Sequence, residues 1–65
     1  MSDPISPAHY QFPNGAQVID ITENLPFNLG NVVKYVARAG RKSPDPMEDL
    51  YKARYYLNRE IERLT

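Results

Sequence analysis

The sequence predicts a small all-α domain in which a short helix packs across a hairpin of two longer helices. Apolar residues recur at helical spacing in three separate stretches, and proline or glycine separates one stretch from the next. A length of 65 residues leaves room for one domain only. Prolines are dense near the start of the chain, so we expect an extended arm over residues 1–8 and the domain itself over residues 9–65.

The first predicted helix is short and lies between Gly15 and Pro26. Its apolar positions recur at helical spacing, at Val18, at Ile21 or Thr22, and at Leu25. Pro26 ends this helix, because proline lacks the backbone N–H and disfavours a helical conformation in the residue before it. The stretch from Val18 to Leu25 corresponds to about two helical turns.

The second predicted helix covers residues 27–39 and forms the centre of the domain. Its apolar face contains Leu29, Val32, Val33, Val36 and Ala37. The β-branched valines have only moderate helix propensity, so burial must hold this segment helical. Gly40 follows as the C′ residue, where glycine tolerates a positive φ.

The third predicted helix begins within residues 45–48 and runs to about Leu64. Asp45 as N-cap, Pro46 at the first helical position and Glu48 at the third form a strong start signal. Its apolar positions follow the i, i+3, i+4 pattern at Leu50, Ala53, Leu57, Ile61 and Leu64.

The composition excludes several classes of protein. The absence of cysteine and the single histidine exclude zinc fingers and disulfide-stabilised secreted domains. Eight basic residues balance eight acidic ones, which excludes a protein that coats nucleic acid through excess charge. There is neither a secretory signal nor an apolar stretch of the roughly 20 residues that a membrane span requires, so we expect a cytoplasmic protein without a membrane partner. A chain this short has a marginal core, and we therefore expect a homo-oligomer.

Cationic side chains gather on the central helix and just after it. Asn31, Lys34, Arg38 and Arg41 share one helical face, and Lys42 adds a fifth donor. Lys and Arg on one face can surround a phosphate with charge-assisted hydrogen bonds, and the sequence contains no glycine-rich phosphate loop. The alternative is an ordinary solvated polar face.

Tyrosine accounts for five of the seven aromatic residues. These tyrosines are Tyr10, Tyr35, Tyr51, Tyr55 and Tyr56. A phenol offers a flat apolar face and a polar tip, which suits a nucleobase. Tyr35 is flanked by the cations of the central helix, which favours a ligand role for it. The alternative for the three tyrosines of the third helix is packing at the edge of the core or in an oligomer interface.

Several other charged residues have two interpretations each. Arg54 lies beside the apolar stripe of the third helix and needs either an acidic partner or a ligand. The candidate acids are Asp20, Glu23, Glu48 and Asp49. These four carboxylates could instead converge on Mg²⁺, although acids in the first turn of a helix are favoured by the helix dipole alone. His9 is a candidate general base, but a lone histidine is more often a surface or packing residue.

Three segments together resemble a known family. They are His9-Tyr10, residues 27–42 with the sequence F-N-L-G-N-V-V-K-Y-V-A-R-A-G-R-K, and residues 48–57 with the sequence E-D-L-Y-K-A-R-Y-Y-L. The family is a small phage-encoded domain family of unknown function, and the segments are also similar to part of a phage nucleotide kinase that lacks a P-loop. The resemblance implies nucleotide handling, an oligomer, and matching motif positions at His9, Tyr10, Asn31, Lys34, Tyr35, Arg38, Lys42, Asp49 and Lys52. This chain is far shorter than the kinase relative, so the resemblance favours nucleotide binding over catalysis.

The first functional hypothesis is an oligomeric module that binds phosphorylated nucleotides and sequesters a host signalling nucleotide, for example a cyclic dinucleotide. Cationic side chains would hold the phosphates, aromatic rings would contact the base, and an amide would read a base edge or the ribose. The cations are Lys34, Arg38, Lys42 and Lys52. The aromatic rings are those of Tyr10 and Tyr35, and the amide is that of Asn31.

The second hypothesis is an enzyme. A deoxynucleoside monophosphate kinase would use the same cations to stabilise phosphoryl charge, with His9 or Asp49 as the catalytic residue that positions the nucleophile. A phosphohydrolase would gather the four acids around Mg²⁺, although the paired E-x-x-E and E-x-x-D pattern of all-α pyrophosphatases is not present. Mg²⁺ is the one cofactor that the enzyme hypothesis requires, and a non-catalytic binder requires none. A third hypothesis is a protein-binding adaptor that uses the tyrosines of the third helix.

Overall fold

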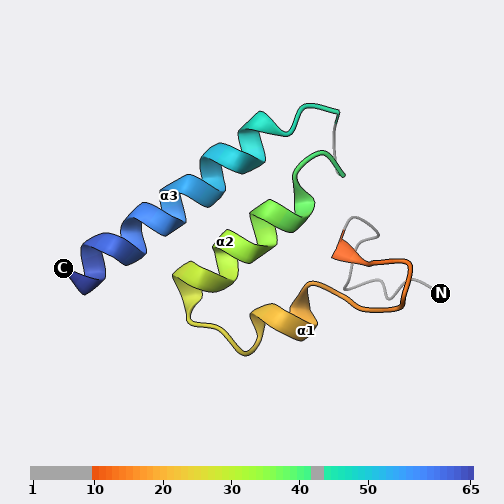
Figure 1. Ribbon diagram of the computed structural model, residues 1–65, viewed down its shortest axis with the longest axis horizontal. Coiled ribbons are helices and arrows are strands. Elements are labelled where there is room, and N and C mark those ends of the chain that lie inside the picture. The colour runs from red at the N-terminus through yellow and green to blue at the C-terminus, as the bar shows by residue number, and fades with distance from the viewer. Residues whose placement is uncertain (1–9, 42–43) are drawn as a thin grey trace.

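The fold is an antiparallel helical hairpin with a single-turn helix packed against one of its arms (Figure 1). The computed structural model describes residues 10–41 and 44–65. The helices are α1 (Ile19–Thr22), α2 (Phe27–Arg38) and α3 (Met47–Leu64). In the described residues β-structure is limited to one isolated bridge, so the predicted all-α class is confirmed. The predictions for the arm over 1–8, for His9 and for Lys42 lie outside the described residues.

A tight loop carries the chain from Tyr10 into α1. Gln11 and Gln17 form the isolated antiparallel bridge, and the backbone N–H of Val18 donates to the carbonyl oxygen of Tyr10 at 2.8 Å. Gly15 occupies the turn with a φ of 88°, which glycine adopts at little steric cost. Val18 is 5% exposed, so its hydrogen bond to Tyr10 attaches the loop to the core and positions Tyr10.

Helix α1 is shorter than the sequence predicts. It contains four residues, because the Asn24 side chain takes the carbonyl oxygen to which the Asn24 backbone N–H would bond in a continuing helix. The carboxylate of Asp20 accepts a hydrogen bond from the backbone N–H of Gln17 at 2.7 Å, and the amide of Asn24 donates to the carbonyl oxygen of Asp20 at 3.0 Å. The residues before Pro26 therefore form turns rather than a second helical turn.

Helix α2 agrees closely with the prediction. It begins directly after Pro26 and ends at Arg38, and the backbone N–H of Ala39 still bonds to the carbonyl oxygen of Tyr35 at 3.0 Å. Gly40 has a φ of 77° and reverses the chain direction, as expected for a glycine at C′.

Helix α3 begins at Met47, one residue after the predicted first helical position at Pro46. The carboxylate of Asp45 accepts a hydrogen bond from the backbone N–H of Met47 at 2.9 Å, which satisfies one of the free donors of the first turn. The Glu48 side chain, expected to serve the same cap, forms an ion pair with Lys52. None of the helices in the described part of the chain is both long and apolar enough to span a membrane.

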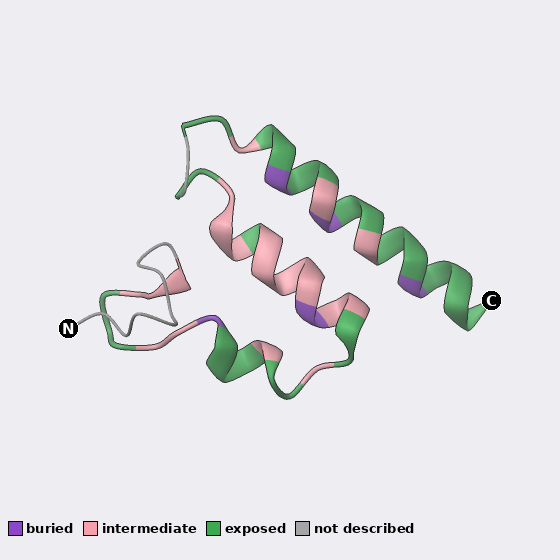
Figure 2. Cartoon of the chain, turned by 180° about the vertical axis from the view of Figure 1, so that it is seen from behind, coloured by how far each residue is buried: buried purple, intermediate pink, exposed green. Residues whose placement is uncertain are grey.

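The buried core of the described residues is small and differs from the predicted core. Val18 and Ala53 are its buried apolar residues, and most of α3 is exposed (Figure 2). The other two buried residues of α3, Asp49 and Glu60, are acidic. The leucines and the isoleucine of α3, expected to form the core face, are instead 40% to 69% exposed. Helical periodicity had correctly grouped these residues on one face, but that face does not pack against α2.

Candidate functional site

Three cations surround one aromatic ring between α2 and α3. The ring is that of Tyr35, and its centroid lies 5.2 Å from Nζ of Lys34, 5.6 Å from Cζ of Arg38 and 5.4 Å from Nζ of Lys52. Lys34 also lies 5.8 Å from the ring centroid of Tyr10. These distances fall within the range of cation–π attraction. We refer to Tyr10, Lys34, Tyr35, Arg38 and Lys52 as the cation–aromatic cluster.

Arg38 connects the three parts of the chain that meet in this cluster. Its Nη1 donates a hydrogen bond to the phenol oxygen of Tyr10 at 3.1 Å, and its Nε lies 3.1 Å from Oδ1 of Asp49. The hydrogen bond to Tyr10 is the main cause of a pKa of Arg38 above its ordinary value, and the Asp49 carboxylate adds to it. The guanidinium therefore stays charged, and it joins the N-terminal loop, α2 and α3.

The Arg38–Asp49 contact is an ion pair without a well-oriented hydrogen bond. The side chains are 15% and 6% exposed, and neither Nε nor Oδ1 has a hydrogen-bonding partner among the described residues. The attraction is therefore chiefly Coulombic, and a buried donor and a buried acceptor stay unsatisfied at the edge of the cluster.

The charges of the cluster are not balanced. Lys52 pairs with Glu48 at 3.1 Å, which is the main cause of a pKa of Lys52 above its ordinary value. With Asp49 beside Arg38, two carboxylates offset three cations. Lys34 forms no ion pair in the described part of the chain, so the excess positive charge is centred on it. An anion beside Lys34 would relieve the repulsion among the three cations.

A third tyrosine extends the aromatic surface of the cluster along α3. The ring of Tyr56 stacks on that of Tyr35 with centroids 5.9 Å apart and planes 8° from parallel. Phe27 and Tyr55 meet Tyr56 edge-on, with centroid distances of 5.9 Å and 5.2 Å. The packing alternative for these tyrosines is thus realised for Tyr56, while Tyr55 is 58% exposed.

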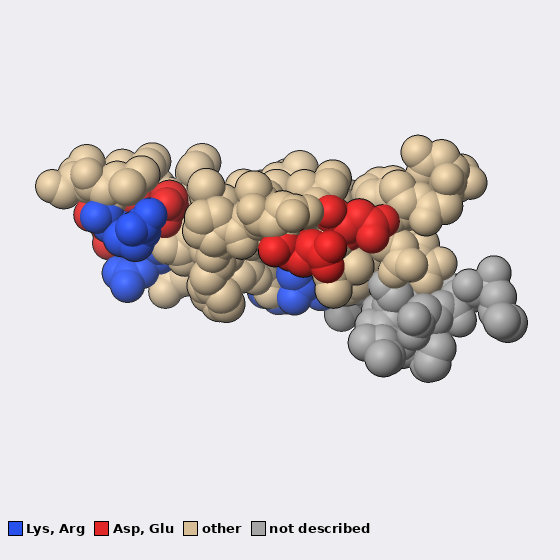
Figure 3. Space-filling view, turned by 90° about the horizontal axis from the view of Figure 1, so that it is seen from below, with Lys and Arg blue, Asp and Glu red and all other residues tan. Residues whose placement is uncertain are grey.

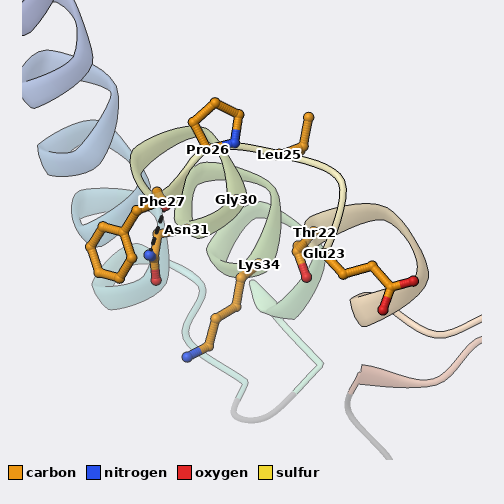
Figure 4. Close-up of a pocket in the computed structure, with 8 residues that line it drawn as sticks. All are labelled: Thr22, Glu23, Leu25, Pro26, Phe27, Gly30, Asn31 and Lys34. Carbon is orange, nitrogen blue, oxygen red and sulfur yellow. Dashed lines mark hydrogen bonds between the residues drawn. The ribbon is translucent and has the colours of Figure 1, made fainter.

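A hollow of about 360 Å³ lies beside the cluster, between α1 and the start of α2 (Figure 4). Its lining consists of Thr22, Glu23, Leu25, Pro26, Phe27, Gly30, Asn31 and Lys34. Lys34 belongs to both the hollow and the cluster. The Asn31 side chain also lines the hollow, but its amide donates to the carbonyl oxygen of Phe27 at 2.9 Å. Gly30 is buried there, and a Cβ at this position would lie 3.5 Å from the carbonyl oxygen of Thr22, which is an ordinary contact.

A separate polar cluster, which sequence reasoning missed, lies near the C-terminal end of α3. Glu60 is 6% exposed and accepts hydrogen bonds from Nε of Arg63 at 2.9 Å, from Nη2 of Arg63 at 2.7 Å and from Asn28 at 3.2 Å. The bonds from Arg63, and then that from Asn28, lower the pKa of Glu60 from 4.5 to about 2. In Figure 3 the basic side chains form two separate groups on the face shown, so they do not make one continuous band there.

Other sequence candidates lie apart from the cation–aromatic cluster. No group of three His, Asp or Glu residues in the described part of the chain could hold a metal ion, so the four acids proposed for Mg²⁺ do not converge. None of these acids pairs with Arg54, whose Cζ lies 4.8 Å from the ring centroid of Tyr51. Arg41 donates to the carbonyl oxygen of Gln11 and lies over Phe12 at 4.6 Å, so it fastens the N-terminal loop.

A family described as a protein of unknown function, DUF3310, matches residues 5–58. The chain belongs to this family. Neither a curated protein nor a solved structure matches the chain. The match spans the whole cation–aromatic cluster and the hollow beside it. The family description carries no activity, so the similarity to part of a phage nucleotide kinase stays a prediction.

Proposed function

We propose that this protein binds phosphorylated nucleotides at the cation–aromatic cluster. The observation that carries the proposal is the Tyr35 ring with three cations within 5.6 Å, of which Lys34 has no carboxylate partner in the described residues. A phosphate combines negative charge with several acceptor oxygens, and a nucleobase adds a flat surface for aromatic contact. A nucleotide therefore matches both halves of the cluster.

Each side chain has a distinct role in this proposal. Lys34 supplies the principal phosphate contact, and Lys52 follows when the ligand competes with Glu48 for its ammonium group. Arg38 is held by Asp49 and Tyr10, so it provides a fixed positive charge more than a mobile clamp. The base contacts Tyr10 or Tyr35. Asn31 reaches a base edge or the ribose from the hollow only if it releases the carbonyl of Phe27.

The biological role that we propose for this binding is sequestration of a signalling nucleotide, with cyclic dinucleotides among the candidates. Two anionic phosphates between two bases would suit a positively charged cluster flanked by aromatic rings. Phosphoryl transfer to a deoxynucleoside monophosphate is the alternative proposal, and it requires a base or nucleophile-positioning group. Of the two candidates, Asp49 is 4% exposed and engaged with Arg38, and His9 lies outside the described residues.

The experiment is incubation of the purified chain with nucleoside mono- and triphosphates and cyclic dinucleotides, with and without Mg²⁺. The free nucleotides are separated by chromatography before and after heat denaturation. We expect one class to be depleted and then recovered unchanged. A phosphorylated or hydrolysed product would support the enzyme alternative, and no depletion would refute nucleotide binding and favour a protein-binding adaptor.

A pair of charge-removing variants locates the binding. Lys34→Gln removes the cation without a carboxylate partner and should weaken binding about tenfold or more, since charged hydrogen bonds contribute about 1.5 to 3 kcal/mol. Arg59→Gln is the matched control, because Arg59 is an exposed cation paired with Glu62 at the opposite end of α3. Equal effects of the two variants would mean that binding reflects general charge and not the cluster.

A further inference from the structure

A stripe of exposed apolar side chains runs along the whole length of α3. Leu50, Leu57 and Leu64 are seven residues apart and are 40%, 45% and 69% exposed. Met47 and Ile61, 45% and 52% exposed, belong to a second series with the same spacing. The two series alternate by three and four residues, which is the a and d pattern of helices that pack on one another in a coiled coil.

The stripe does not face α2. Asp49, Ala53 and Glu60 are the buried residues of α3, and Asp49 and Glu60 both bond to α2 side chains. Leucine at the d position favours the packing of two helices, yet in this chain these leucines contact solvent.

Helix α2 extends the apolar surface on the same side of the hairpin. Tyr35 and Tyr56 face each other across the two helices, and each is followed by an apolar residue, Val36 and Leu57. Each step along a helix rotates the side-chain direction by about 100°. Because the two helices run antiparallel, the rotations have opposite senses. The residues that follow two facing positions therefore point to the same side of the hairpin. Val36 is 55% exposed, so the side of α2 that adjoins the leucine stripe is also uncovered in the single chain.

We propose that this face, defined by Val36, Met47, Leu50, Leu57, Ile61 and Leu64, is the surface through which two copies of the chain associate. It is distinct from the cation–aromatic cluster and does not rest on nucleotide binding. A second copy is the favoured occupant because a stripe with a and d spacing is complementary to itself. The resulting assembly is a bundle of four helices, two from each copy.

The small size of the core supports a second copy. Val18 and Ala53 are the buried apolar side chains among the described residues, which is little for a domain that must offset its conformational entropy. A standard interface buries about 800 Å² on each partner, or about one sixth of this chain's surface of 4847 Å². Association would therefore bury the apolar surface that the single chain leaves in water.

Arg54 lies within the a series, between Met47 and Ile61. A charged residue at one a position lowers the stability of such a seam while restricting its register. In the single chain Arg54 lies over Tyr51, which is itself 53% exposed at the edge of the stripe. Arg54 thus allows a test in which a substitution strengthens the association.

The experiment is sedimentation velocity of the full chain from micromolar to millimolar concentration. We expect a dimer or a higher symmetric assembly built on it. Leu57→Glu should raise the dissociation constant about 100-fold or more, equal to about 2.7 kcal/mol, and Arg54→Leu should lower it about tenfold. The matched control is Tyr55→Glu, which adds the same charge at a b position about 160° away from Leu57 around the helix, where the side chain is 58% exposed, and it should change the constant less than about threefold.

The helical signal in circular dichroism shows whether Leu57→Glu still folds. If Leu57→Glu does not fold, Arg54→Leu still tests the face, because it should strengthen the association. A wild-type chain that stays monomeric at millimolar concentration would overturn the proposal. So would an oligomer that neither substitution alters, because its interface would then lie elsewhere on the molecule.

Discussion

The Arg38–Asp49 pair provides the sharpest test of how the hairpin is held together. The two residues lie on different helices and their side chains are 15% and 6% exposed. Replacing Arg38 by methionine leaves the Asp49 carboxylate buried without a cation. Breaking a buried ion pair in this way costs about 3 to 5 kcal/mol, and we expect about 3 because the contact lacks an aligned hydrogen bond.

The reciprocal change should cost less. In Asp49→Leu the guanidinium keeps its hydrogen bond to Tyr10 and its position over Tyr35, so we expect a loss of about 1.5 kcal/mol. In the double variant neither charge is left alone, and the loss should be about 2 kcal/mol. The coupling energy between the two sites is then about 2 to 3 kcal/mol.

Urea denaturation followed by circular dichroism measures these values, at one fixed protein concentration because self-association shifts apparent stability. A domain of this length has a free energy of unfolding of about 3 to 10 kcal/mol, so Arg38→Met can approach complete unfolding. Single losses below about 1 kcal/mol that simply add in the double variant would refute a structural role for the pair.

Three further predictions concern stability, each measured by urea denaturation. Gly30→Ala should stabilise the chain by about 0.5 to 1 kcal/mol, since the new Cβ would lie 3.5 Å from the carbonyl oxygen of Thr22, an ordinary contact; destabilisation would contradict this. Asp45→Ala should cost about 1 kcal/mol through loss of the bond to the N–H of Met47, and unchanged stability would show that this cap is unimportant. Folding lowers the pKa of Glu60 from 4.5 to about 2, so the unfolded chain binds more protons between these values, and the free energy of unfolding should fall as the pH decreases through that window. Glu60→Gln should remove this part of the pH dependence, and an identical profile in the variant would assign it to other groups.

The helix boundaries were predictable because they depend on local chemistry. Pro26, Gly40 and Asp45 act through backbone geometry and a neighbouring N–H, which the sequence displays directly. The length of α1 was not predicted. The bond from the Asn24 side chain to the carbonyl oxygen of Asp20 competes with helix extension, and apolar spacing does not reveal this competition.

The direction of the α3 face was beyond sequence reasoning. Spacing groups Leu50, Leu57, Ile61 and Leu64 on one side of a helix, but it does not say whether α2 or another chain covers that side. The buried positions toward α2 include Asp49 and Glu60, which average hydrophobicity assigns to the surface.

The candidate site was predictable in part. Lys34, Tyr35 and Arg38 are close in sequence on one helix, so their proximity follows from helical spacing. The contributions of Tyr10 and Lys52 depend on how the loop and α3 pack against α2. The engagement of Arg38 with Asp49, which leaves Lys34 as the cation without a carboxylate partner in the described residues, also emerges only from tertiary structure.

The measurement that tests the central proposal most directly is an amide NMR titration of the chain with a nucleoside triphosphate, a nucleoside monophosphate and a cyclic dinucleotide. We predict that at least one ligand saturably shifts the signals of Lys34 and Tyr35. The signals of Arg59 and Glu62, at the far end of α3, should stay in place. No shift with any ligand, or shifts centred on Arg59 instead of Lys34, would contradict nucleotide binding at the cation–aromatic cluster.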